Sequence, residues 1–224
     1  MAQAKPTIHD KAIDALMTVL ARRDWGEISL ADVAREAEVS LADLRAAYPS
    51  TGAILGAYVK RIDLAVLKDD SSDLADQPVR ERLFDLLMRR LDAMEPHKAA
   101  IRRLRRGLRY DPFAAKAWNQ LSVTSHQWTL AAAGVTETGA LGATKAQVLA
   151  CAFSSVLDAW AEDLDPGHDR TLRILDEQLG RLERLAEAAN GLRQLTAPLR
   201  AFCCGSSRRD RSAPGEELSE ANAI

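Results

Sequence analysis

The stretch SLADVAREAEVSLAD, residues 29–43, carries the same four letters at 29–32 and at 40–43. A serine followed three residues later by an acid has the spacing of a capping box. The hydroxyl accepts a hydrogen bond from a free backbone N–H, and the acid favours the positive end of the helix dipole. The period is too short for a solenoid repeat, which needs about 20–50 residues. The two copies therefore predict two helix starts.

Small and apolar residues between the two starts predict how these helices pack. Ala34 is small where two helices would cross, Val39 fills the turn between them, and Leu44 anchors the second helix. This is the inward pattern of a helix-turn-helix, with the second helix within 40–48. Glu38 lies in the turn, where positive φ is expected at a cost of about 1 kcal/mol for a residue other than glycine.

Composition and periodicity predict an all-α protein. The chain of 224 residues is 47% hydrophobic and 28% charged, and its apolar residues recur with helical spacing. Helices are expected around 11–20, twice within 29–48, from 50 to 67, from 78, from 96, at 111–134, at 144–164 and at 168–190, with a loop at 71–78. We therefore predict three segments: a helix-turn-helix domain at 1–68, a larger helical effector-binding and dimerisation domain at 69–190, and a largely disordered tail at 191–224.

Several classes of function are disfavoured. Three cysteines make no disulfide framework, and no cluster of His, Cys or acidic residues has metal-ligand spacing. Nothing indicates catalysis, a cofactor or a signal peptide, and the apolar stretch 148–157 is too short to span a bilayer. We expect a cytoplasmic protein that binds rather than catalyses. The weakly amphipathic segment 191–205 is compatible with a peripheral membrane or partner contact.

The helix-turn-helix resembles that of the TetR family of one-component transcriptional regulators. The matching residues are Gly26, Ser29, the DVA of 32–34, the A-x-VS of 37–40, Leu44, and Tyr48-Pro49-Ser50 ahead of Ile54-Leu55. The resemblance implies an N-terminal three-helix domain, a homodimer whose second helices enter successive major grooves of double-stranded DNA, and a small apolar effector in the larger domain. The DNA contacts it implies are Ser29, Ser40, Leu41, Ala42, Asp43, Arg45, Tyr48 and Thr51.

Charge around the predicted reading helix departs from that family. Arg45 stands where the family often has Tyr, Ala47 where it has His, and Thr51 where it has Lys. Residues 29–51 contain two arginines against four acids, for a charge of −2. Because phosphate contacts dominate affinity, this predicts weak binding unless arginines and lysines at 22, 23, 60 and 61 contribute.

Two further sites are expected in the larger domain. Aromatic and sulfur-containing side chains at helical spacing predict either simple core or an apolar ligand pocket formed by Phe84, Met88, Trp118, His126 and Trp128. Apolar faces on the last two helices predict a four-helix dimer interface formed by Phe153, Leu157, Trp160, Leu172, Leu175, Leu179 and Leu182. The alternative is that these faces pack only inside the monomer. The basic run at 102–110 is interpreted as a solvated helix face whose aliphatic stems cover the core.

An alternative interpretation comes from the C-terminal half. The segments 96–104 and 158–183 resemble the lipid-binding accessory family of ubiquinone biosynthesis, which shares the TetR fold. That resemblance implies binding of an isoprenoid lipid and an enzyme partner, without DNA binding. The acidic reading helix favours this alternative, whereas the spacing of the helix-turn-helix favours the regulator.

Overall fold

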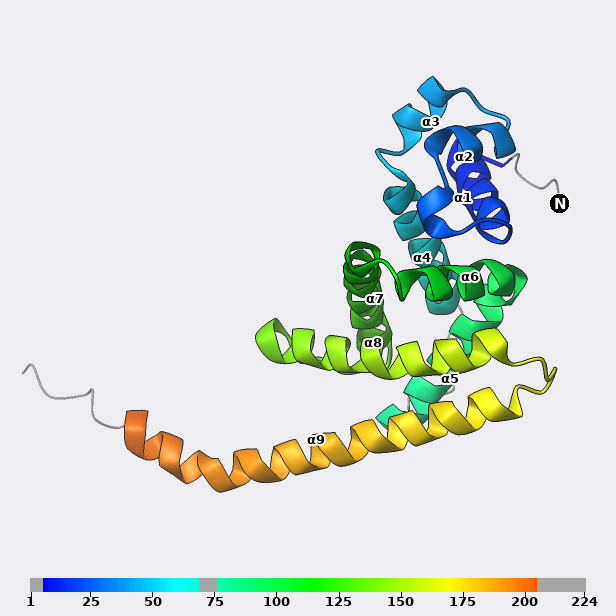
Figure 1. The fold of residues 1–224 in the computed structure, drawn as a ribbon. Helices are drawn as coiled ribbons and strands as arrows, with labels where there is room; N and C mark the ends of the chain where they lie inside the picture. Colours follow the sequence, from blue (N-terminus) through cyan, green and yellow to red (C-terminus); the bar gives the residue numbers. More distant parts are fainter. Residues whose placement is uncertain (1–5, 69–75, 205–224) are drawn as a thin grey trace, which may run out of the picture. The chain divides into compact units, whose positions relative to one another are not determined.

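The fold is described by a computed structural model for residues 6–68 and 76–204, with backbone alone for 189–204. Within these ranges the chain is helical and contains no strand (Figure 1). The predicted disorder of 205–224 lies outside the described residues. The elements are α1 (Ile8–Leu20), η1 (Trp25–Glu27), α2 (Leu30–Glu36), α3 (Leu41–Ala47), α4 (Thr51–Lys68), α5 (Val79–Met94), η3 (Glu95–His97), α6 (Lys98–Leu108), α7 (Pro112–Ala132), α8 (Gly139–Glu162) and α9 (Asp169–Cys204).

Both SLAD sequences start helices, as predicted. Ser29 caps α2 in a full capping box: its hydroxyl accepts from the Asp32 N–H, and the Asp32 carboxylate accepts from the Ser29 N–H. Ser40 caps α3 through the Asp43 N–H, and its hydroxyl donates to the Asp43 carboxylate at 2.7 Å. Each cap satisfies backbone donors that have no partner within the helix. The Asp111 N-cap of α7, followed by Pro112, is confirmed as well.

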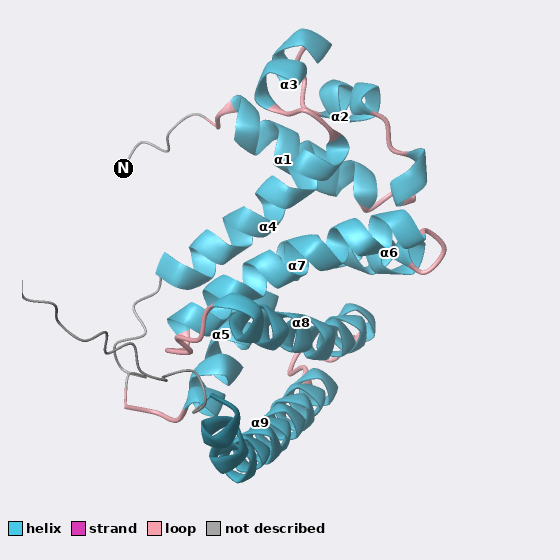
Figure 2. Cartoon of the chain, turned by 90° about the vertical axis from the view of Figure 1, so that its left-hand side faces the viewer, coloured by secondary structure: helices cyan, strands magenta, loops and turns pink. Residues whose placement is uncertain are grey.

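Residues up to Glu183 form one compact unit with one hydrophobic core. In that unit α1 packs on α2, α4 and α6, α4 packs on α5 and α7, and α7 packs on α8. Figure 2 shows α4 running from the α1–α3 group to the level of α5 and α7. The α4 helix thus contributes to the packing of both predicted domains, whose boundaries stay a prediction.

The boundaries of the last two helices differ from the predicted ones. The α8 helix begins at Gly139 rather than Thr144 and ends at Glu162 rather than Leu164. The α9 backbone continues past the predicted end at Asn190 to Cys204, since Leu, Arg, Gln and Ala in this segment are good helix formers. The part of α9 from Arg184 onward belongs to a second unit.

In the described part of the chain, α8 is the one helix long and apolar enough to cross a membrane by length and composition. Most of its large apolar residues are buried in the core. Leu149, Phe153, Val156 and Trp160 are buried, and the helix packs on α6 and α7. Such burial is typical of a core helix.

Candidate functional site

The geometry of a helix-turn-helix is present at α2 and α3. Val33, Ala34 and Leu44 are buried at the helix crossing, and Val39 packs against the same core. The Val39 N–H donates to the Ala34 carbonyl at 3.1 Å, which closes the turn. Glu38 has φ +54°, so the predicted left-handed conformation is confirmed at a residue other than glycine. The sequence pattern located this motif correctly.

The α3 helix presents an exposed face at the end of the compact unit farthest from α8 in both views (Figures 1 and 2). Leu41 is 56% exposed, and Ala42, Asp43 and Arg45 are exposed beside it. These four residues, all predicted DNA contacts, therefore share one accessible surface. Arg45 is the only cation in the α3 sequence.

The other predicted DNA contacts occupy different environments. Ser29 and Ser40 use their hydroxyls as helix caps, and Thr51 is half-buried at the start of α4. Tyr48 differs from the prediction, because it is largely buried and its ring meets the His9 ring edge-on at 5.1 Å. Burial also raises the pKa of the Tyr48 hydroxyl. Its ring packs in the core between α1 and α3 instead of lying on the exposed face.

The acids of α2 are neutralised by neighbouring arginines. Asp32 lies 3.1 Å from Arg23 and 3.2 Å from Arg35, and Glu36 lies 3.5 Å from Arg22. Hydrogen bonds from Ser29, assisted by Arg23 and Arg35, lower the pKa of Asp32 to about 2. The charge count of the sequence therefore overstates the acidity of α2, and Arg22 and Arg23 are already engaged.

The exposed acids nearest α3 are Glu38 and Asp43. Asp43 is held over the α3 N-terminus by the Ser40 hydroxyl, and Glu38 is exposed in the turn. Arg45, in the last turn of α3, is the basic residue that offsets their negative charge. The exposed surface of α3 is therefore apolar at Leu41, acidic at its N-terminal end and basic in its last turn.

The five predicted pocket residues do not enclose one cavity. His126 is buried and Trp118 is half-buried, and both line a cavity of about 30 Å³. Trp128 is 59% exposed, so its assignment to a pocket is corrected. Phe84 and Met88 pack against the core from α5 and do not line this cavity. Helical spacing alone did not distinguish the faces of α7 on which the two tryptophans lie.

A buried polar network that sequence reasoning missed lies beside this cavity. The Arg90 guanidinium of α5 donates to the Asp63 carboxylate of α4 at 2.5 Å and to the Thr129 hydroxyl of α7 at 3.3 Å. The Ser125 hydroxyl donates to the same Asp63 oxygen at 2.6 Å. A signal existed, because Arg90 follows Leu83 and Leu87 on the buried stripe of α5.

His126 is neutral in this interior. Burial lowers its pKa to about 3, and the positive charge of Arg90 acts in the same direction. Its Nδ1 lies 2.7 Å from the Ser122 carbonyl oxygen, which accepts hydrogen bonds only, so Nδ1 carries the proton. Its Nε2 is therefore a buried hydrogen-bond acceptor.

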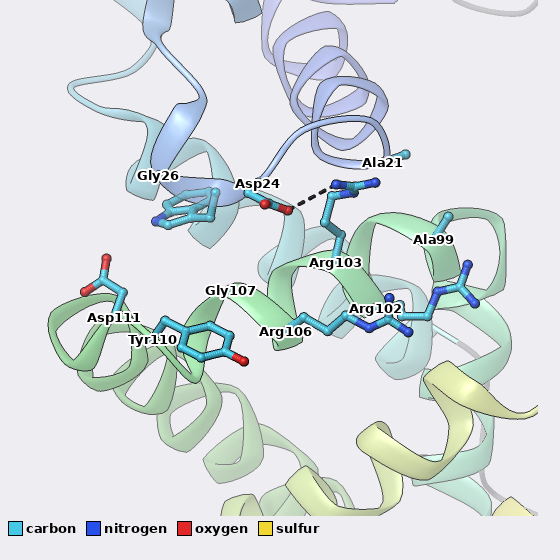
Figure 3. Close-up of a pocket in the computed structure, with 11 residues that line it drawn as sticks. Ala21, Asp24, Gly26, Ala99, Arg102, Arg103, Arg106, Gly107, Tyr110 and Asp111 are labelled. Atoms are coloured by element: carbon cyan, nitrogen blue, oxygen red, sulfur yellow. Dashed lines mark hydrogen bonds and ion pairs between the residues drawn. The ribbon is translucent and has the colours of Figure 1, made fainter.

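The basic run at 102–110 is largely engaged within the molecule. The Arg105 guanidinium donates two hydrogen bonds of 2.8 Å to the Asp158 carboxylate. Arg106 forms an ion pair with Glu162 at 2.8 Å. Arg103 forms one with Asp24 at 3.1 Å. Figure 3 shows the Arg103–Asp24 contact at the edge of a groove of about 490 Å³ between α6 and the segment joining α1 to α2. Arg103 therefore ties α6 to the helix-turn-helix.

The predicted dimer interface requires a correction. Phe153, Leu157 and Trp160 of α8 are buried in the core of the monomer. In α9, Leu175 and Leu179 are buried too, and Leu172 and Leu182 are half-buried. Five of the exposed residues of α8 form a different stripe with spacings of three and four residues, namely Leu141, Thr144, Val148, Cys151 and Ser155.

No group of three or more His, Cys, Asp or Glu residues able to hold a metal occurs in the part of the chain that the structure describes. No protein-family model matches the sequence, and no curated protein matches it either.

Solved structures, in contrast, share the fold. A TetR transcriptional regulator from Nitrosomonas europaea is similar with a TM-score of 0.62 at 21% identity, over 78% of this chain and 97% of that one. A TetR transcriptional regulator from Rhodococcus sp. RHA1 is similar with a TM-score of 0.52 at 16% identity, over 77% of this chain and 95% of that one. The chain has the TetR fold, with an N-terminal helix-turn-helix and a larger helical part.

Proposed function

We propose that this protein is a TetR-like one-component regulator that binds operator DNA as a homodimer and responds to a small apolar effector. The observation that carries the proposal is the exposed α3 face at the outer end of a TetR fold. An α-helix of this kind fits the major groove of B-DNA. Arg45 is suited to a phosphate or to the acceptor edge of a guanine. The function is one of binding, without catalysis, and a cytoplasmic location fits it.

The α4 helix supplies a physical link between DNA and effector. It begins at Thr51, directly after α3 and the turn at Tyr48–Ser50, and it carries Tyr58 and Asp63 in the interior. A ligand that alters the packing of α4 on α7 therefore acts on the orientation of α3. In the proposed regulator this displacement changes the fit of α3 to DNA.

The exposed stripe of α8 is the proposed seam of the homodimer. Residues spaced three and four apart form a continuous line on a helix, and the small side chains Thr144, Cys151 and Ser155 permit close approach of a second helix. Leu141 and Val148 supply apolar area in the same line. This seam replaces the buried α8 residues of the sequence-based prediction.

A salt-titrated binding assay with the DNA upstream of the protein's own gene tests the proposal. We expect specific binding that weakens as salt rises, because phosphate contacts release counterions. Arg45→Ala should weaken specific binding by roughly 5- to 150-fold, the range for a contact of about 1–3 kcal/mol. Lys116→Ala, an exposed residue of α7, makes the same change in net charge and should leave binding unchanged.

A second candidate is a TetR-fold lipid-binding accessory protein that does not bind DNA. The exposed acids Glu38 and Asp43 beside α3 favour it, since they oppose the approach of phosphates. Absence of any sequence-specific shift at low salt would reject the regulator. An isoprenoid lipid identified by mass spectrometry in the purified protein would then support this candidate.

A further inference from the structure

Three buried polar atoms without a partner belong to residues that line one small cavity. The cavity of about 30 Å³ is lined by Tyr58, Arg90 and His126 together with apolar side chains of α4, α7 and α8. The Tyr58 hydroxyl, the Arg90 Nε and the His126 Nε2 have no hydrogen-bond partner among the described residues. Each residue is at least nine-tenths buried. Leaving such groups unpaired is costly, so their presence on one cavity indicates a bound polar group.

The three atoms differ in their hydrogen-bonding roles. The Arg90 Nε–H can only donate, whereas the Tyr58 hydroxyl can donate or accept. The His126 Nε2 accepts, because Nδ1 holds the ring proton against the Ser122 carbonyl. A group that accepts hydrogen bonds from Arg90 and Tyr58 and donates one to His126 would satisfy all three atoms. A hydroxyl group has this capacity.

The charge of the cavity selects against ions. The Arg90 guanidinium is neutralised by Asp63 at 2.5 Å, and His126 is uncharged. A carboxylate would meet no surplus positive charge there and would place its own charge in a low-dielectric interior. An ammonium group only donates hydrogen bonds, so it would leave the Arg90 Nε–H without an acceptor. The cavity is thus matched to a neutral group.

The body of a ligand would have room beyond Trp118. This half-buried side chain lines the small cavity and also two larger hollows of about 360 and 320 Å³. The second of these is lined by Gly52 and Leu55 of α4 and by Leu104 and Leu121. A change of the Trp118 rotamer would connect the small polar cavity with the larger, mainly apolar hollow. Small-molecule sites usually combine a few polar groups with an apolar lining.

We propose that Tyr58, Arg90 and His126 bind the hydroxyl group of a neutral apolar alcohol or phenol, and that Trp118 is the side chain that moves to admit it. The assignment of this ligand as the effector rests on the proposed function. Its binding does not, because none of the contacts involves α3 or a second subunit.

Calorimetric titration of the full-length protein with octanol, octanoate and octylamine tests the choice of end group, since the three share one tail length. We expect saturable binding of octanol, and binding weaker by more than about tenfold for the two ions. Tyr58→Phe removes one donor without changing the ring and should weaken octanol binding about five- to tenfold. The Phe variant should stay folded, because the hydroxyl it loses has no partner among the described residues.

The role of Trp118 is tested by substitution, with Trp128, an exposed tryptophan of the same helix, as the control. Trp118→Ala should accelerate octanol association in stopped-flow measurements, whereas Trp128→Ala should not alter it. Equal affinity of octanol and octanoate, unchanged affinity in Tyr58→Phe, or no binding of octanol would overturn the inference. The last result would mean that the cavity holds a water molecule only.

A parallel gel-shift experiment separates the two proposals. Octanol binding without sequence-specific DNA binding rejects the regulator and retains the hydroxyl site. DNA binding with no octanol binding retains the regulator and rejects the hydroxyl site. If both occur, octanol should change the affinity of the wild type for DNA and have less effect on Tyr58→Phe.

Discussion

Arg90 on α5 and Asp63 on α4 form a buried salt bridge of 2.5 Å in the interior of the compact unit. Ser125 and Thr129 of α7 complete the network, so three helices meet at one charge pair. Buried charges of this kind are costly to separate although they add little net stability. The pair therefore fixes how α4, α5 and α7 pack against one another.

Removing Arg90 should destabilise the fold strongly. Arg90→Met leaves the Asp63 carboxylate buried without its cation, and we expect the free energy of unfolding to fall by about 3–5 kcal/mol in urea denaturation. The double variant Asp63→Leu with Arg90→Met should recover much of this loss. Arg61→Met, which breaks the more exposed 2.7 Å pair with Asp14, serves as the control and should cost about 0–1 kcal/mol. Equal losses for the two single variants would contradict this account.

Replacing Glu38 should separate backbone strain from charge. Glu38→Gly relieves the left-handed conformation at φ +54° and should raise the free energy of unfolding by up to about 1 kcal/mol. Glu38→Gln removes the same charge and keeps the strain, so its stability should match the wild type. If the protein binds DNA as proposed, both variants should bind nonspecific DNA more tightly at low salt. A stability gain shared by both variants would show that strain is not the cause.

Stability should decline in mild acid because of His126. Its pKa is about 3 in the folded protein and near 6.5 in the unfolded chain, so below about pH 6.5 the unfolded state binds a proton that the folded state does not. The free energy of unfolding should fall by at most about 1.4 kcal/mol per pH unit between about pH 6 and pH 4, with no contribution above about pH 7.

The measurement is urea denaturation across this range, where His126→Gln should flatten the dependence. His97, half-buried with its ring edge-on to Tyr58 at 5.4 Å, has a pKa lowered by burial, so it acts in the same direction. His97→Gln should therefore remove a smaller part of the slope. An unchanged slope in His126→Gln would disprove the assignment.

Dimerisation through α8 should be sensitive to one side chain. Val148→Asp places a charge in the middle of the exposed stripe and should convert a dimer into a monomer in light scattering. Val79→Asp on α5 is the matched control, because Val79 and Val148 are 38% and 39% exposed. A Val148→Asp protein that remains dimeric would show that the subunits associate elsewhere.

Local signals in the sequence were sufficient to predict the helix-turn-helix. Capping serines, a turn that needs positive φ and apolar residues at crossing points are interactions within a few residues, so the predicted geometry at Ser29, Glu38 and Ser40 is confirmed. The same holds for the start of α7 at Asp111.

Faces of long helices were harder to predict, because apolar residues look alike whether they meet the core or a partner. Phe153, Leu157 and Trp160 were assigned to a dimer but fill the core, and Trp128 was assigned to a pocket but is exposed. The position of Arg90 on the apolar stripe of α5 indicates a buried charge, but its partner Asp63 lies on another helix, so no local pattern identifies the pair. The sequence placed Arg23 near the helix-turn-helix, but its contact with Asp32 spans the segment between α1 and α2, which helical spacing does not describe.

The α4 helix is long enough that a small tilt displaces its far end measurably. Twelve residues separate Thr51 from Asp63, which is about 18 Å of helix at about 1.5 Å per residue. A tilt of about three degrees over that length shifts the far end by about 1 Å. In a twofold dimer both α3 helices would shift, against a groove repeat of about 34 Å along the DNA. A ligand that displaces α4 in the interior would thus change the distance between the two α3 helices of the dimer.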